Sequence, residues 1–218
     1  MRKPRNCASV RYQMLLGNCG SCCFQLLSEK RRTALRSLPG PATLLHYNPL
    51  YTLGSSFSLW SARATLACGD DVLVMDADVL YHADILRRLV TSPVRNCYLL
   101  DRDFAPGDEP VKLCMAGARI VEFRKRVADG LAYDRIGESV GFFKFDAATA
   151  LLLARLLDAY VADGRRAEPH EEALRDLALR PELAIGVEDI TGLPWLEIDF
   201  PEDLLRARDD VLPRIEAR

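Results

Sequence analysis

The sequence lacks the features that mark a membrane protein, a secreted protein or a nucleic-acid-binding protein. No apolar run reaches the roughly 20 residues that cross a bilayer, and no signal peptide with a long apolar centre is visible. The 218 residues carry a net charge of -2, without the basic excess that nucleic-acid binding usually needs. We therefore expect a cytoplasmic protein of one main domain, with no membrane and no nucleic acid among its partners.

Charge and cysteine divide the chain near residue 40. Residues 1–40 hold eight Lys or Arg against one acidic residue, so residues 41–218 carry a net charge of -9. Four of the seven cysteines also lie before residue 40. Cys19 and Cys22 form a Cys-x-x-Cys pair, but no second pair or histidine follows at the spacing of a zinc site. We expect residues 1–40 to be an atypical Cys/Arg-rich segment and residues 41–218 to be one domain.

From residue 41 onward, short apolar runs alternate with helical patterns, which is typical of α/β proteins. We expect strands at 42–46, within 72–80, and at 96–100, 111–115, 119–123, 139–145, 183–187 and 195–198. Helices are expected over 58–67, 82–89, 149–161 and 171–179, and from Pro201. Ser58 and Asp146 are the expected N-caps of two of these helices. The strands on either side of Gly117 should form a hairpin.

Two carboxylates follow the most apolar strand of the sequence. Val72 to Leu80 reads Val-Leu-Val-Met-Asp-Ala-Asp-Val-Leu, and such a run predicts a strand buried on both faces of a parallel sheet. Asp76 and Asp78 are two residues apart and should project to the same side, at the sheet edge where α/β proteins bind ligands. Carboxylates there suit Mg²⁺. The alternative is that one of them caps the next helix while the other is solvated.

Four stretches, in the same order, resemble the nucleotidyltransferases of the sugar-phosphate and phosphocholine cytidylyltransferase type. They are Asn48-Pro49-Leu50-Tyr51 with Gly54 to Trp60, Met75 to Asp78, Gly137 to Gly141 with Lys144-Phe145, and Trp195 to Asp199 with Pro201 to Leu204. The resemblance covers residues 41–210, approximately, and implies an α/β fold. Its Rossmann-like nucleotidyltransferase sheet should be mostly parallel, with the hairpin as a small insertion.

The resemblance also implies a reaction. A phosphate or phosphonate oxygen of a small acceptor such as phosphocholine attacks the α-phosphorus of a nucleoside triphosphate, CTP being favoured, and pyrophosphate leaves. Mg²⁺ is the implied cofactor, and it neutralises charge between the two anions. The implied partners are therefore a nucleoside triphosphate and a small phosphorylated substrate, and a homodimer is left open.

The resemblance assigns roles to individual side chains. The implied catalytic residues are Asp78, Asp199 and Lys125, and the implied metal ligands are Asp78 and Asp199. Nucleotide binding is implied for Gly54, Ser55, Ser56 and Asp76, and substrate binding for Glu138, Glu171 and Lys112. Each lysine has a solvated surface position as its alternative, and each glutamate a turn, salt-bridge or first-turn role. Trp60 and Trp195 are expected in the core instead of on a ligand.

Residues 1–40 depart from the family's pattern. The family begins with a strand and a Gly-rich loop resembling GxGxRLxPLT, which cradles the triphosphate, and has a Pro-Lys pair further on. Gly17 to Ser21 contains glycines, but no Arg-Leu-x-Pro follows, and Pro39 precedes a glycine. The segment could be an unrelated start, a targeting leader, or the mark of a member that binds without catalysing. We accordingly expect low stability and weak or absent activity for this chain.

Three functions therefore compete. A Mg²⁺-dependent nucleotidyltransferase leads, and a non-catalytic nucleotide-binding protein that has lost the phosphate loop is the alternative. A metal-dependent glycosyltransferase that uses the Asp76/Asp78 pair is the third, and the Glu197-Ile198-Asp199 stretch argues against it.

Overall fold

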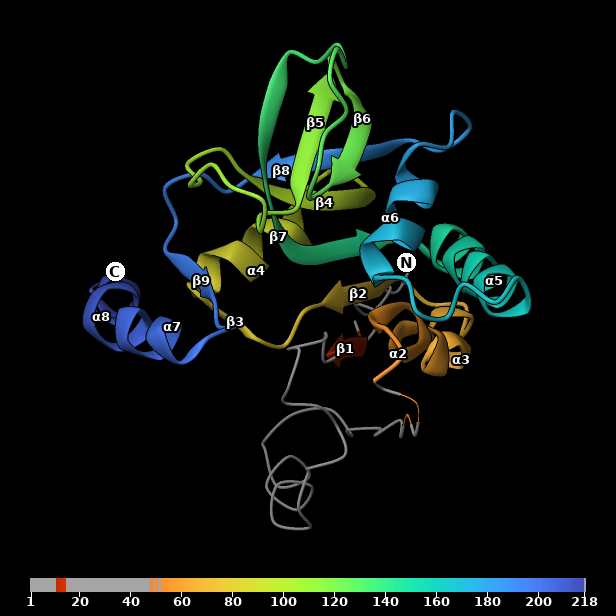
Figure 1. The fold of residues 1–218 in the computed structure, drawn as a ribbon, viewed down its shortest axis with the longest axis horizontal. Coiled ribbons are helices and arrows are strands. Elements are labelled where there is room, and N and C mark those ends of the chain that lie inside the picture. Colours follow the sequence, from red (N-terminus) through yellow and green to blue (C-terminus); the bar gives the residue numbers. More distant parts are fainter. Residues whose placement is uncertain (1–10, 15–47, 49, 51, 218) are drawn as a thin grey trace, which may run out of the picture.

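A computed structural model of the chain describes residues 11–14, 48, 50 and 52–217 (Figure 1). The expected strand at 42–46 and the Cys19/Cys22 pair lie outside the described residues. The strands are β1 (Arg11–Met14), β2 (Val72–Met75), β3 (Val79–Tyr81), β4 (Asn96–Asp101), β5 (Lys112–Ala116), β6 (Arg119–Arg124), β7 (Arg135–Phe145), β8 (Ile185–Asp189) and β9 (Trp195–Glu197). The helices are α2 (Ser55–Ser61), α3 (Arg63–Leu66), α4 (Ala83–Thr91), α5 (Ala147–Ala162), α6 (His170–Ala178), α7 (Pro201–Arg206), the π-helical turn η2 (Ala207–Val211) and α8 (Leu212–Glu216).

The main sheet has the order β1-β2-β7-β4-β8, and β5 and β6 extend it from the first half of β7. The α/β class is confirmed, but the expectation of a mostly parallel sheet is wrong. Among the described strands, only β1–β2 and β4–β8 pair in parallel, because the long strand β7 runs antiparallel to both β2 and β4, and the hairpin is antiparallel throughout. A strand buried on both faces is apolar whichever way it runs, so its composition does not fix its direction.

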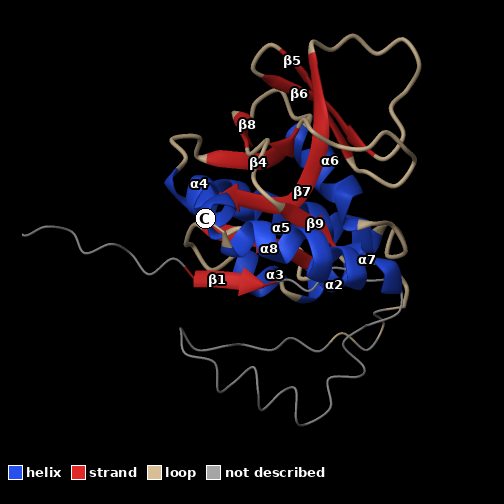
Figure 2. Ribbon diagram, turned by 90° about the vertical axis from the view of Figure 1, so that its left-hand side faces the viewer, coloured by secondary structure: helices blue, strands red, loops and turns tan. Residues whose placement is uncertain are grey.

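Both faces of this sheet are covered, and the side chains of β2 alternate between them. Val72 and Val74 belong to the larger core cluster, under helices α2, α3, α5 and α6, whereas Leu73 and Met75 belong to the cluster under α4. Figure 2 shows the helices on either side of the strands. Successive strand residues point to opposite faces, so the unbroken apolar run of β2 is explained by two buried faces.

The stretch from Val72 to Leu80 is not one strand. The main-sheet strand ends at Met75, and after three residues β3 begins and pairs antiparallel with β9 in a separate two-stranded sheet. That small sheet packs on η2 and α8 through a third cluster, which includes Leu196, Ala207 and Val211. Asp76 and Asp78 therefore lie in the link between the two sheets.

Several element boundaries differ from the expected ones. Helix α2 begins at Ser55, three residues before the expected start, so Ser58 is not its N-cap and its hydroxyl instead accepts a hydrogen bond from Asn48 Nδ2 at 3.0 Å. Asp146 is confirmed as the N-cap of α5, since its carboxylate accepts from the Thr149 N–H at 2.9 Å. The hairpin around Gly117 is confirmed as β5–β6.

None of the helices in the described part of the chain has the length and apolar character of a membrane-spanning segment.

Candidate active site

Three carboxylates converge where the two-stranded sheet leaves the main sheet. Asp78 immediately precedes β3, Glu197 ends β9, and Asp199 follows two residues later. Val79 pairs with Glu197, and the Ile198 N–H donates to the Asp78 carbonyl at 2.8 Å. One oxygen from each of Asp78, Glu197 and Asp199 lies within 4.8 Å of the other two. The pairing of β3 with β9 therefore builds an acidic cluster from distant parts of the sequence, called here the carboxylate cluster.

The carboxylate cluster carries more negative charge than its protein surroundings offset. Burial, and then the charge of Asp76, raises the pKa of Asp78 to about 6. Partial loss of hydration at the Glu197 carboxyl group, followed by the charges of Asp199 and Asp78, raises its pKa to about 8, although the residue as a whole is exposed. Asp78 Oδ1 is buried and accepts no hydrogen bond from the described residues. A divalent cation would satisfy this oxygen and reduce the repulsion among the three groups.

Asp76 lies beside the carboxylate cluster without belonging to it. Its Oδ1 is 3.4 Å from Nε2 of His170, the first residue of α6. Its backbone N–H donates to the Gly141 carbonyl at 3.0 Å. Gly141 has φ +75°, and a Cβ there would be 2.2 Å from Asp76 Oδ2, so only glycine leaves room for this carboxylate.

His170 is buried among acidic groups. Its Nδ1 lies 3.2 Å from Glu171 Oε2 and 3.1 Å from Ser55 Oγ, on the side of the ring away from Asp76. Burial by itself would favour the neutral ring, but the charges of Glu171 and Asp76 outweigh it and raise the pKa of His170 to about 10. These neighbouring charges therefore favour the imidazolium form of the ring.

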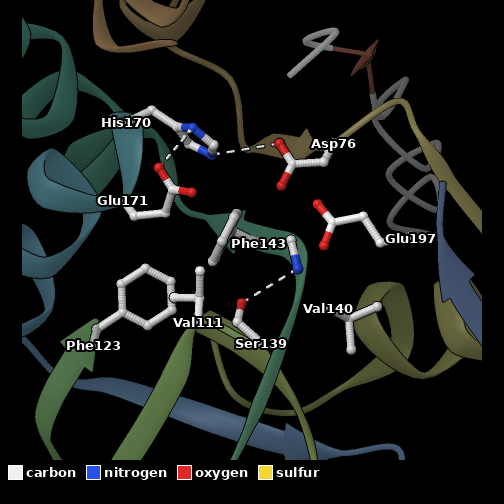
Figure 3. Close-up of a pocket in the computed structure, with 10 residues that line it drawn as sticks. Asp76, Val111, Phe123, Ser139, Val140, Phe143, His170, Glu171 and Glu197 are labelled. Atoms are coloured by element: carbon white, nitrogen blue, oxygen red, sulfur yellow. Dashed lines mark hydrogen bonds and ion pairs between the residues drawn. The ribbon is translucent and has the colours of Figure 1, made fainter. Parts of the chain in front are cut away.

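A cavity open to solvent lies between these groups (Figure 3). Its lining residues are Asp76, Val111, Phe123, Ser139, Val140, Gly141, Phe143, His170, Glu171 and Glu197. Figure 3 shows the carboxylates of Asp76, Glu171 and Glu197 around one side of the space and apolar groups on the other. The cavity thus combines negative charge with an apolar wall beside the carboxylate cluster.

The expected nucleotide-binding residues at the start of α2 lie against the loop before α6. A Cβ on Gly54 would be 2.7 Å from the backbone of Ala167, which explains why this position is glycine. Ser56 Oγ donates to the Pro169 carbonyl at 2.9 Å, and Ser55 Oγ accepts from the His170 N–H at 2.8 Å. Both hydroxyls therefore bind within the protein, and the role of this segment in nucleotide binding stays a prediction.

The two lysines of the hairpin occupy different environments. Lys112 Nζ donates to the carbonyl oxygens of Gly107, Pro110 and Lys125 at 2.6, 3.3 and 2.6 Å, so it ties the ends of the hairpin together. Lys125 Nζ pairs with Glu109 at 3.0 Å. Burial raises the pKa of the Asp199 carboxyl group, and the positive charge of Lys125 opposes this rise. Of the two, Lys125 is the one near the carboxylate cluster.

The two glutamates expected to bind substrate are also separated. Glu171 lines the cavity, whereas Glu138 does not. Glu138 lies opposite Asp101 in the sheet, and burial followed by the charge of Asp101 raises its pKa to about 7. Trp195 Nε1 donates to the same Asp101 at 2.7 Å, and neither Trp60 nor Trp195 lines the cavity.

No protein-family description and no curated protein matches the sequence. Solved structures do match. The inositol-1-phosphate CTP transferase from T. maritima superposes with a TM-score of 0.56 and 17% identity, over 78% of this chain and 65% of that one. The CTP:phosphocholine cytidylyltransferase from Streptococcus pneumoniae superposes with a TM-score of 0.50 and 20% identity, over 76% of this chain and 67% of that one.

The chain has a nucleotidyltransferase fold. The match spans 65% of the length of the T. maritima transferase, and at 17% and 20% identity the two superpositions establish the fold and not the activity. The Rossmann-like class expected from the sequence is thereby confirmed.

Two residues of this nucleotidyltransferase fold were not identified from the sequence. Glu197 precedes Asp199 by two positions at the end of a strand. Because residues two apart in a strand point to the same face, this spacing could have predicted that Glu197 lies beside Asp199. His170 gave no such signal, because its partners Asp76 and Ser55 come from the link after β2 and from the start of α2, which only the tertiary fold brings to α6.

Proposed function

We propose that the chain is a Mg²⁺-dependent nucleotidyltransferase that moves a nucleoside monophosphate to a small phosphorylated or phosphonate acceptor and releases pyrophosphate. The observation that carries the proposal is the carboxylate cluster of Asp78, Glu197 and Asp199, next to an open cavity on a nucleotidyltransferase fold. CTP is the favoured donor, because both solved structures described above are named as CTP-using transferases.

The donor set of the carboxylate cluster suits Mg²⁺. Three carboxylates supply hard oxygen ligands, and one of their oxygens is buried without a hydrogen-bond donor among the described residues. Asp78, Glu197 and Asp199 would hold the ion, which when bound offsets the repulsion between the acceptor oxygen and the α-phosphate. Glu197 is thereby added to the two aspartates that the sequence predicts.

The remaining side chains would bind and orient the two anionic substrates. Lys125 extends from the hairpin near Asp199 and would act on the phosphates as a point charge, released from its exposed pairing with Glu109. Asp76 and the Gly54-Ser55-Ser56 segment would border the nucleotide, and Lys112 would hold the hairpin in place. Positioning is the main contribution, because the acceptor oxygen forms its bond to the α-phosphorus as the bond to pyrophosphate breaks, with no covalent enzyme intermediate.

The cavity favours an acceptor with a cationic head group, such as phosphocholine. Asp76, Glu171 and Glu197 line it, and His170 is the one cationic side chain in the lining. An ammonium group would gain Coulomb energy against these carboxylates and contact the apolar wall at Val111 and Phe123. Glu138, which does not line the cavity, would add negative charge without touching the head group.

The test is pyrophosphate release with Mg²⁺ across CTP, UTP, ATP and GTP. The acceptor panel is phosphocholine, 2-aminoethylphosphonate, inositol 1-phosphate and glucose 1-phosphate. We expect release with CTP and phosphocholine, and at least a 100-fold loss in Asp78→Asn, since that variant removes a ligand of the metal. Asp129→Asn, an exposed aspartate in the link before β7, is the matched control and should retain the activity.

Two other outcomes would contradict the proposal. Binding of CTP to the folded protein, with no pyrophosphate from any pair, would favour a nucleotide-binding protein without catalysis. Transfer of a sugar from a sugar nucleotide, without pyrophosphate, would favour a glycosyltransferase.

A further inference from the structure

Asp76 and Asp78 are two residues apart and leave the same strand, yet only Asp78 joins the carboxylate cluster. Asp76 nevertheless lines the same cavity as Glu197, so its carboxylate lies beside the cluster. Figure 3 shows the Asp76 carboxylate between the His170 ring and the Glu197 carboxylate. Something must therefore keep this fourth carboxylate out of the cluster.

His170 has the geometry to do so. Its Nε2 faces Asp76 Oδ1 at 3.4 Å, and its other ring nitrogen is held by Glu171 and Ser55 at 3.2 and 3.1 Å. The backbone N–H of His170 also donates to Ser55 Oγ at 2.8 Å, which ties the start of α6 to the start of α2. The ring is buried and cannot turn away from Asp76 without losing these contacts.

The opposite side of Asp76 is closed by β7. Gly141 approaches the carboxylate so closely that a Cβ would be 2.2 Å from Oδ2, and the Gly141 carbonyl accepts from the Asp76 N–H at 3.0 Å. The Asp76 side chain is therefore held between a cationic ring and a glycine backbone.

We propose that His170 is a positioning residue that holds Asp76 away from the carboxylate cluster, so that the cluster offers three carboxylates to a divalent cation instead of four. The inference rests on the proposed function, because it takes the cluster to be a cation site. Mg²⁺ is held by few carboxylates and keeps water and phosphate ligands, whereas Ca²⁺ takes six to eight oxygens. Holding Asp76 back therefore favours Mg²⁺ over Ca²⁺ and leaves coordination positions for substrate phosphates.

The test measures Ca²⁺ and Mg²⁺ affinities by calorimetry for the full chain, His170→Gln, Asp76→Asn and the double variant. Glutamine retains a hydrogen-bonding group for Ser55 but carries no charge. We expect His170→Gln to raise the preference for Ca²⁺ over Mg²⁺ about tenfold, which is about 1.4 kcal/mol, because Asp76 can then join the cluster. In the double variant, the preference should return to within about twofold of the wild-type value.

The ratio of the Ca²⁺ affinity to the Mg²⁺ affinity distinguishes a change in the position of Asp76 from a simple loss of the His170 charge. Loss of the positive charge alone would tighten Ca²⁺ and Mg²⁺ binding by similar factors and leave the ratio unchanged, and that result would overturn the proposal. His82→Gln is the matched control. His82 is also a buried histidine, but its ring caps α4, accepts from the Asp84 N–H at 3.1 Å and does not line the cavity.

Asp76→Asn decides the matter if His170→Gln does not fold. Because Asp76 is not a ligand in the proposal, Asp76→Asn should weaken Mg²⁺ binding about threefold or less, against at least tenfold for Asp78→Asn. Equal losses in the two variants would overturn the inference while leaving the cation site intact. Absence of cation binding in the wild-type protein would overturn both the inference and the proposed metal site.

Discussion

Single residues at the link between the two sheets decide which carboxylates enter the carboxylate cluster. Asp76 and Asp78 have the same residue type and nearly the same position in the sequence. Their environments differ, since one meets His170 and Gly141 and the other meets Glu197 and Asp199. A sequence motif of two aspartates therefore conceals two environments, which neighbouring residues create.

Gly141→Ala should destabilise the protein by about 3 kcal/mol, because a positive φ is strained for alanine and the new Cβ would displace Asp76. Gly117→Ala is the matched control: it also has positive φ, +60°, but nothing lies within 4 Å of a Cβ there, so about 1 kcal/mol is expected. Urea unfolding measures both. Equal losses would show that Asp76 does not restrict residue 141.

Glu197→Gln should weaken Mg²⁺ binding about tenfold, since it removes one of the three ligand carboxylates. Calorimetric titration of the full chain gives the affinity. Glu202→Gln, an exposed glutamate in the first turn of α7, is the control and should bind as the wild type does. An unchanged affinity in Glu197→Gln would reduce the site to the two aspartates.

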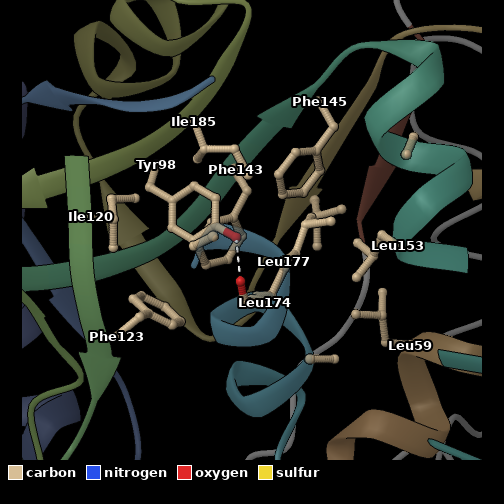
Figure 4. Close-up of a cluster of buried hydrophobic side chains, with 14 of the residues drawn as sticks. Leu59, Tyr98, Ile120, Phe123, Phe143, Phe145, Leu153, Leu174, Leu177 and Ile185 are labelled. Atoms are coloured by element: carbon tan, nitrogen blue, oxygen red, sulfur yellow. Dashed lines mark hydrogen bonds between the residues drawn. The ribbon is translucent and has the colours of Figure 1, made fainter. Parts of the chain in front are cut away.

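At the scale of elements, helix α6 connects the core to the site. Its first residue is His170, and its middle is fixed to the sheet by the Tyr98 hydroxyl, which donates to the Leu174 carbonyl at 2.8 Å (Figure 4). The Tyr98 ring packs edge-on against Phe143 of β7, with the ring centroids 4.7 Å apart. The position of His170 is therefore determined by contacts deep in the core.

Tyr98→Phe should cost about 1–2 kcal/mol, because it leaves the buried Leu174 carbonyl without this donor while it retains the ring. Chemical denaturation measures the loss. Tyr133→Phe changes an exposed tyrosine and should have little effect. If both variants are as stable as the wild type, the hydrogen bond does not hold α6 in place.

Boundaries and strand directions were the least predictable features of the elements. The helix and strand types expected from residue 96 onward are confirmed, because each apolar pattern has one period and a clear start or stop signal. The start of α2 was misplaced, because the close approach of Gly54 to Ala167 fixes it and those residues are distant in sequence.

At the scale of the whole molecule, β1 belongs to the main sheet although residues 1–40 show no family resemblance. It runs parallel to β2, with Met14 opposite Met75, so its carboxyl end lies at the edge where Asp76 leaves the sheet. The division of the chain at residue 40 stays a prediction, as do its low stability and weak activity.

The pH dependence of stability is a property of the whole molecule. Asp78, Glu138 and Glu197 have pKa values raised to about 6, 7 and 8, so the folded protein holds protons that the unfolded chain releases near pH 4. The raised pKa of His170 acts in the same direction. Since the unfolded state binds fewer protons, the free energy of unfolding should fall as pH rises from 5 to 9.

Thermal unfolding at pH 5.5, 7 and 8.5 tests this dependence, and without metal the midpoint should fall at each step. Mg²⁺ should reduce the decline, because it stabilises the ionised carboxylates of the cluster. Stability that rises with pH would show that these carboxyl groups are already ionised in the folded protein.

The sequence by itself determined the α/β class and most elements, because local periodicity and short motifs carry that information, and its family resemblance predicted Asp78 and Asp199 as metal ligands. Tertiary structure alone decided the antiparallel course of β7, the inclusion of Glu197, and the separation of Asp76 from Asp78. Strand direction depends on how the chain returns to the sheet, and the environment of each carboxylate depends on His170 and Gly141, which come from distant elements. Contacts between such elements leave no periodic trace in the sequence.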